Sequence, residues 1–260
     1  WWPNTYYAKQ AEYAVELQAS LISRLQEQAL LPLVGVGALL LPGFAFLIVH
    51  ALRRKSWAVL AGAIWALGYI VMYALRLPVT YQYGRYVMPM MPVYFALGTA
   101  GMAAMLAALP NSFWMRVTKR VWIFSSAIVL LVFWFQGAQI YRRDVAFIEE
   151  EMVAAAHWVA QNTPPDSLVA AHDIGALGYF AQRQLVDLAG LVSPQVIPFI
   201  RDEARLAAFL DEMQAGYLVT FPGWYPTLVQ SGELLYQTSG TAALSMGGEN
   251  MVVYRWRFSR

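Results

Sequence analysis

The stretch WAVLAGAIWALGYIVMYALRL, residues 57–77, decides the fold class, because Arg76 is its single charged residue. An α-helix needs about 20 mainly apolar residues to cross the roughly 30 Å hydrocarbon core of a bilayer. We therefore expect this stretch to form a transmembrane helix, with the Arg76 side chain reaching out to the membrane boundary.

Apolar runs of similar length surround this stretch, and the sequence predicts spans at about residues 30–51, 57–77, 87–109 and 121–140. No Asp or Glu lies between Gln28 and Arg143. An acid at mid-bilayer costs about 2.5–3.5 kcal/mol on insertion scales, so a multi-span region is expected to lack acids. These features predict an α-helical membrane bundle of about four transmembrane helices over residues 29–143.

The composition of the whole chain agrees with this fold class and narrows the function. The 260 residues are 59% hydrophobic and 13% charged, and the mean hydropathy of +0.44 exceeds that of an ordinary soluble domain. A net charge of +2 without a Lys/Arg-rich tract argues against nucleic acid as a partner. Cysteine is absent and the three histidines lack metal-ligand spacing, so the sequence identifies no metal site and no cofactor, and a divalent metal has no support in it.

Basic residues in the short loops predict the orientation of the spans. The clusters at residues 53–55 and 116–120 lie between the first two and the last two spans. By the positive-inside rule both clusters are cytoplasmic. The turn at residues 81–86, the leading residues 1–28 and the region 144–260 then face the outside.

The two outward regions differ in pattern. Asn4 to Gln28 has the apolar periodicity of one amphipathic helix, which we expect on the outer membrane surface or against the bundle. Residues 144–260 alternate between helical patterns, at 145–161 and 203–214, and short β-rich runs, at 167–171, 184–188, 217–221, 234–238 and 251–257. They predict a small extracytoplasmic α/β domain with a largely parallel sheet, in which Glu149–Glu151 form a solvated helix face.

The outward turn Tyr81-Gln-Tyr-Gly-Arg-Tyr86 is a candidate anion site. The guanidinium of Arg85 offers a planar set of donors suited to phosphate, and Tyr83 and Tyr86 add phenolic donors beside it. Arginine and tyrosine also serve as interfacial anchors that need no ligand. The residues alone leave both interpretations open.

Two parts of the sequence resemble a known family. Gly84-Arg85-Tyr86 with Pro89 and Pro92, preceded by Pro3-Asn-Thr-Tyr-Tyr-Ala-Lys9, resembles the C-terminal half of bacterial GT-C glycosyltransferases. This group includes protein O-mannosyltransferases, aminoarabinose transferases and arabinofuranosyltransferases. The segments 172–180 (HDIGALGYF) and 186–191 (VDLAGL) are similar to the outer domain of some of these proteins.

The resemblance implies an enzyme of the bacterial inner membrane that uses a polyprenyl-phosphate sugar donor and a glycan, lipid or protein acceptor. The donor phosphate is expected at Arg85, Tyr83, Tyr86 and Lys9. A solvated helix lysine is the alternative for Lys9. The family places its catalytic carboxylate on an early outward loop that this chain does not contain, so the base is expected in sequence upstream of residue 1.

Polar residues of the outer domain are candidates for contacting the acceptor. His172 and Asp173 follow one predicted strand and Asp187 ends the next, where α/β sheets often bind ligands. Turn-forming and capping roles are the alternative. Trp224–Pro226 form either a loop that stacks on carbohydrate or touches the membrane, or part of the domain core.

Two other functions stay open. The chain can be a non-catalytic membrane-anchored protein whose outer domain binds a glycan or another partner. It can also be a transporter subunit for lipid-linked sugars, although the predicted spans contain no acid for a proton relay.

Overall fold

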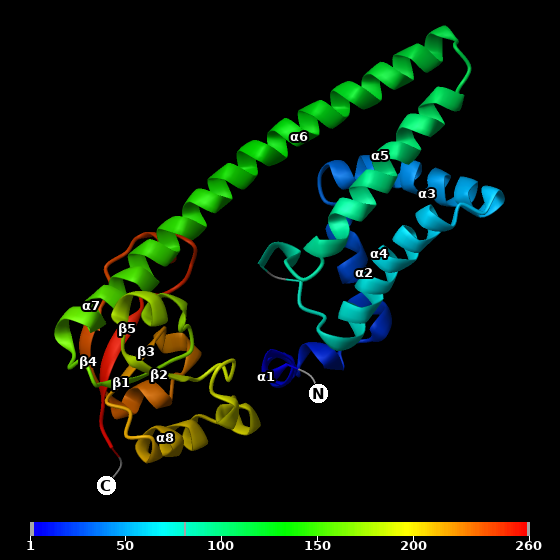
Figure 1. Cartoon of the computed structure of the whole chain (residues 1–260). Coiled ribbons are helices and arrows are strands. Elements are labelled where there is room, and N and C mark those ends of the chain that lie inside the picture. The colour runs from blue at the N-terminus through cyan, green and yellow to red at the C-terminus, as the bar shows by residue number, and fades with distance from the viewer. Residues whose placement is uncertain (1–2, 81, 259–260) are drawn as a thin grey trace. The chain divides into compact units, whose positions relative to one another are not determined.

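The computed structural model in Figure 1 describes residues 3–80 and 82–258. The chain forms two compact units. Residues 1–12 and 139–260 form the first, which we call the sheet unit, and residues 13–138 form the second, which we call the helical unit. The chain leaves the sheet unit after Glu12 and returns to it within α6 (Phe113–Phe147).

The helical unit contains α2 (Leu21–Leu30), α3 (Val36–Arg54), α4 (Trp57–Arg76), α5 (Met91–Ala108) and the first part of α6. Residues 36–54, 57–76, 88–108 and 113–162 are four helical stretches long and apolar enough to cross a membrane. This confirms the prediction of four long apolar helices. The first begins later than expected, because residues 31–33 form a 3-10 turn around Pro32 and Gly35 has a φ of 64°.

Close contact between α3 and α5 organises the helical unit. A methyl group on Gly101 would overlap the carbonyl oxygen of Gly43, and one on Gly43 would overlap the backbone of Gly98 and Met102. The two backbones therefore touch, as small residues allow in helix pairs. Nearby, the buried Tyr94 hydroxyl donates a hydrogen bond of 2.8 Å to the carbonyl oxygen of Gly37.

The sheet unit contains a mixed five-stranded sheet with the order β2-β1-β3-β5-β4. The parallel strands are β1 (Leu168–Ala171), β2 (Gln184–Asp187) and β3 (Tyr217–Thr220), and the antiparallel pair is β4 (Gly232–Gln237) and β5 (Val252–Trp256). Each strand lies within two residues of its predicted limits. β3 also pairs with β5 antiparallel, which joins the two parts of the sheet.

Helices pack on both faces of this sheet. Alternate residues of β1 point to opposite sides: Val169 packs in a core with residues of α7 (Ala154–Asn162), and Ala170 packs in a second core with residues of α8 (Glu203–Glu212). The result is a three-layer α/β/α arrangement, which places the carboxyl ends of the parallel strands at one edge.

The leading segment is not one helix. It contains α1 (Asn4–Glu12), a 3-10 turn over Glu16–Gln18, and α2. The hydroxyl of Ser20 accepts a hydrogen bond from the Ser23 amide at 3.2 Å and so starts a new helix. α1 belongs to the sheet unit and α2 to the helical unit.

The prediction of a solvated acidic face is also wrong for two of its three residues. Residues 148–153 form a π-helical turn between α6 and α7. Glu151 is 0% exposed and accepts hydrogen bonds from Thr238, Asn250 and the Met251 amide. Glu150 accepts bonds from the amides of residues 241 and 242, at the start of α9 (Ala242–Ser245). Only Glu149 is exposed among the three.

Candidate functional site

Polar side chains gather where the parallel strands end. His172 directly follows β1, Asp187 is the last residue of β2, and Tyr225 follows β3 after a 3-10 turn over Pro222–Trp224. The carboxyl ends of parallel strands form one edge of a sheet, where α/β proteins commonly bind ligands.

His172 lies at the centre of a row of four interacting side chains, which we call the His172 row. Its Nδ1 lies 2.7 Å from the Tyr225 hydroxyl, and its Nε2 lies 3.7 Å from Oε1 of Glu12. The other carboxylate oxygen of Glu12 lies 2.6 Å from Nζ of Lys9. The side chains of Glu12 and His172 are 17% and 23% exposed, so this row is partly shielded yet reachable from solvent.

α1 brings Lys9 and Glu12 to this row. The Asn4 side-chain amide donates hydrogen bonds of 2.7 Å to the carbonyl oxygens of Gly190 and Leu191. The Arg201 guanidinium donates to the Glu12 carbonyl oxygen. α1 is therefore fixed at both ends against the segment that follows β2.

Burial and neighbouring charges shift the pKa values of two side chains in the His172 row. Burial raises the pKa of Glu12, but hydrogen bonding and the positive charges of His172 and Lys9 outweigh it, so the pKa lies below its usual value. Burial also raises the pKa of Tyr225, and the negative charges of Glu12, Asp187 and Glu203 add to this effect. Tyr225 therefore stays protonated and acts as a neutral hydrogen-bonding partner of His172.

The two predicted acids near His172 differ in their contacts. Asp187 is fully buried, and its two carboxylate oxygens accept hydrogen bonds of 2.8 Å from the amides of Ala189 and Val192. These are the contacts of a turn-forming residue, the alternative that the sequence left open. Asp173 is partly buried and lies close to Gly175.

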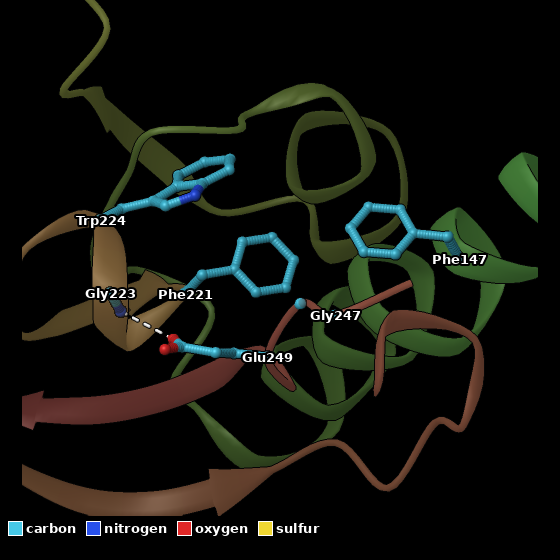
Figure 2. A pocket seen from close by; sticks show the side chains of 7 residues that line it. Phe147, Phe221, Gly223, Trp224, Gly247 and Glu249 are labelled. Carbon is cyan, nitrogen blue, oxygen red and sulfur yellow. Dashed lines mark hydrogen bonds between the residues drawn. The ribbon is translucent and has the colours of Figure 1, made fainter. Parts of the chain in front are cut away.

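A pocket of about 300 Å³ lies in the same unit (Figure 2) and is lined by Phe147, Phe221, Gly223, Trp224, Gly247, Gly248 and Glu249. We call it the aromatic pocket. The Trp224 ring contacts the Phe221 ring and the His172 ring, with centroid distances of 4.9 Å to each. Trp224 therefore connects the aromatic pocket to the His172 row, whereas Tyr225 beside it is buried in the core.

The turn with Arg85 belongs to the helical unit, and its Tyr81 lies outside the described residues. The chain reverses at Tyr83 and Gly84, whose φ angles are 58° and 66°. The Arg85 guanidinium donates a hydrogen bond of 2.8 Å to the Tyr86 hydroxyl and lies 4.8 Å from that ring's centroid. The Tyr86 ring in turn stacks on Tyr73 at 5.7 Å.

The structure thus groups the predicted site residues into two sets. Arg85, Tyr83 and Tyr86 share the turn of the helical unit, and Lys9 joins His172 in the sheet unit through Glu12. Sequence reasoning missed Glu12 and Glu249. Over residues 3–80 and 82–258, no group of three or more His, Asp or Glu residues is arranged to hold a metal ion.

Comparison with known families agrees with the boundary of the sheet unit. A domain of unknown function, DUF8728, matches residues 138–254. No curated protein matches the chain at a significant level. The match begins in α6 and ends in β5, so it includes His172, Tyr225 and the aromatic pocket but not α1 with Lys9 and Glu12. The four long apolar helices are typical of an integral membrane protein.

Proposed function

We propose that the chain is the C-terminal part of a bacterial inner-membrane glycosyltransferase, related to the GT-C group, that transfers a sugar from a polyprenyl-phosphate donor to an extracytoplasmic acceptor. The observation that carries this proposal is the positive charge of Arg85. It lies in a turn between two apolar helices, and the sequence from residue 29 to residue 142 contains no acid to neutralise it.

The contacts of Arg85 support a phosphate ligand. Its side chain is exposed, and among the described residues no carboxylate forms an ion pair with it. One guanidinium nitrogen of Arg85 donates a hydrogen bond to the Tyr86 hydroxyl, which orients the guanidinium. The other N–H donors of Arg85 are not used by this bond. A planar cation with oriented donors binds a phosphate in a bidentate manner more tightly than a lysine does.

In the proposed reaction an acceptor hydroxyl attacks the anomeric carbon of the donor sugar. The bond between that carbon and the phosphate oxygen breaks, and polyprenyl phosphate leaves with its electron pair. Arg85 stabilises the negative charge that develops on the phosphate. The hydroxyl proton passes to a carboxylate that the resemblance expects upstream of residue 1. Lys9 is the weaker phosphate candidate, because it is already paired with Glu12.

The test is sugar transfer by the full-length protein in nanodiscs, with a radiolabelled polyprenyl-phosphate sugar as donor. We expect Arg85→Ala to lower kcat by roughly 10²- to 10³-fold, as loss of a charge-stabilising donor does in other enzymes. Arg85→Lys should retain part of the activity. Arg53→Ala, which removes an exposed arginine at the end of α3, is the matched control. Undiminished transfer by the Arg85→Ala protein would refute the proposal.

A membrane-anchored binding protein without catalytic activity is the second candidate function. The aromatic pocket favours it, because the pocket belongs to the part of the chain that matches DUF8728 and needs no residue of the helical unit. Absence of transfer from every polyprenyl-phosphate sugar, together with saturable ligand binding to the sheet unit, would favour this function over the enzyme.

A further inference from the structure

The aromatic pocket is built by segments that are far apart in sequence. Phe147 comes from the end of α6, Phe221 to Trp224 from the turn after β3, and Gly247 to Glu249 from the loop before β5. The end of β3 and the start of β5 are neighbours, since Thr220 pairs with Val252. The pocket volume of about 300 Å³ is at the lower end of the range for small-molecule sites, roughly 300–1,000 Å³.

Among the described residues, the carboxylate of Glu249 is the only charged group that lines this pocket. One of its oxygens accepts a hydrogen bond of 2.7 Å from the Gly223 amide, drawn as the dashed line in Figure 2. A β-carbon at Gly223 would lie 3.0 Å from the other oxygen, so the lack of a side chain there makes room for the carboxylate. No Lys, Arg or His of the described chain forms an ion pair with Glu249. The pocket therefore presents an uncompensated negative charge.

Aromatic rings form the other side-chain part of the lining. The Phe147 and Phe221 rings stack with centroids 5.7 Å apart, and the Phe221 and Trp224 rings are 4.9 Å apart. Trp224 remains 48% exposed although it contacts both Phe221 and His172. The faces of aromatic rings carry negative electrostatic potential and attract cations, and tryptophan does so most strongly. Both the carboxylate and the rings therefore repel an anion and favour a positive charge.

We propose that the aromatic pocket binds an organic ammonium group, held by Glu249 and by the ring of Trp224. The group is carried either by a small soluble amine or by the head group of a membrane lipid. This proposal does not depend on the glycosyltransferase proposal, since it concerns binding to the sheet unit alone. It assigns a ligand class to a pocket that sequence reasoning had considered only through Trp224.

The test uses the full chain in nanodiscs of phosphatidylglycerol, a lipid without an amine, and calorimetric titration with choline. The matched ligand is 3,3-dimethylbutan-1-ol, which has the shape of choline without the charge. We expect choline to bind about tenfold more tightly than the neutral ligand, because the Glu249 carboxylate and the Trp224 ring both attract the charged ligand and have no such attraction for the neutral one. Equal affinities for the two ligands would overturn the proposal.

Two substitutions locate the site. Glu249→Gln keeps an acceptor for the Gly223 amide but removes the charge, and it should weaken choline binding by about tenfold while leaving the neutral ligand unaffected. Trp224→Leu should weaken choline binding by about two- to fivefold, as expected for a cation–π contact of a half-exposed ring. Glu212→Gln, at the exposed end of α8, is the matched control and should change nothing. If Glu249→Gln binds choline as the unaltered protein does, the proposal fails.

The lipid composition of the nanodiscs distinguishes the two possible sources of the ammonium group. Adding phosphatidylethanolamine or phosphatidylcholine to the nanodiscs should lower the apparent affinity for free choline if a lipid head group occupies the pocket. An unchanged affinity would assign the pocket to a soluble amine. In either case, binding that depends on Glu249 supports the ammonium site.

Discussion

Each of the two units is stabilised internally by a different kind of residue: glycines in the helical unit and carboxylates in the sheet unit. In the helical unit, α3 and α5 meet where side chains are missing, at Gly43, Gly98 and Gly101. In the sheet unit, carboxylates hold the loops by accepting hydrogen bonds from backbone amides, as Glu150, Glu151, Asp187, Glu203 and Glu249 do. Long helices pair their own amides internally and need close packing, whereas the loops of a small sheet leave amides that need an acceptor.

This difference separates charged residues that stabilise the fold from charged residues that are candidates for a functional site. A carboxylate of the sheet unit whose oxygens both bind backbone amides, such as Asp187, is accounted for by the fold. Glu12 stands apart because the structure pairs its carboxylate with the side chains of Lys9 and His172. Arg85 stands apart in the helical unit because its guanidinium donates a hydrogen bond to a neutral phenol, that of Tyr86. These residues therefore carry the candidate sites, together with Glu249, which uses one oxygen for a backbone amide.

We expect the largest effect from a substitution that disrupts the glycine contact of the helical unit. Gly101→Leu would place a side chain into the backbone of α3, so we expect the two helices to separate and the free energy of unfolding to fall by more than about 3 kcal/mol. Gly68→Leu is the matched control, because nothing lies within 4 Å of the position its β-carbon would take. Unfolding of the purified chain by titration with dodecyl sulfate, followed by tryptophan fluorescence, compares the two. Equal stabilities would mean that α3 and α5 do not depend on this contact.

We expect the next largest effect from a substitution that removes a buried carboxylate from the sheet unit. Glu151→Ala leaves the Met251 amide without an acceptor and removes one of the two acceptors of the Thr238 and Asn250 side chains, so we expect a loss of about 2 kcal/mol in the free energy of unfolding. Glu149→Ala, two residues away and exposed, should change it by less than about 0.5 kcal/mol. Urea unfolding followed by near-ultraviolet circular dichroism measures both. Similar losses in the two variants would show that Glu151 does not hold the sheet unit.

The smallest effect concerns Glu12 and pH. Its pKa in the folded protein lies below the usual 4.5, so its stabilising contribution is complete above pH 4.5 and is lost as the pH falls through the lowered pKa. Glu12→Gln should therefore be less stable than the unaltered chain near neutral pH, by about 1 kcal/mol or less, and the difference should vanish in acid. Urea unfolding of both proteins from about pH 7 to about pH 3 measures this difference. A constant difference over this range would show that Glu12 does not act through its charge.

Local patterns in the sequence predicted most of the fold. The absence of acids over residues 29–142 predicted the long apolar helices, and short β-rich runs that alternate with helical patterns predicted the five strands. The break between α1 and α2 was missed because the apolar periodicity continues through Ser20, whose capping hydrogen bond is a local event that hydrophobic spacing does not reveal.

The candidate sites were less predictable because their partners are distant in the chain. Glu151 was expected on a solvated face since it is one of three consecutive acids, but it binds Thr238 and Met251, which are 87 and 100 residues away. Glu12 lies in the segment that was predicted to form one amphipathic helix, and its pairing with His172 depends on how α1 packs against the segment after β2. No spacing rule connects such residues before the sheet unit has formed.

The position of α1 also sets an order of events during synthesis. Asn4 and Gly190, which are joined by a hydrogen bond, are separated by 186 residues, and the whole helical unit lies between them. At roughly 5–20 residues per second, the ribosome needs roughly 10–40 s to make this intervening chain. α1 must therefore wait, without the residues that will fix it, until the segment after β2 has been made. Lys9 and Glu12 consequently reach His172 only after the whole helical unit has been translated.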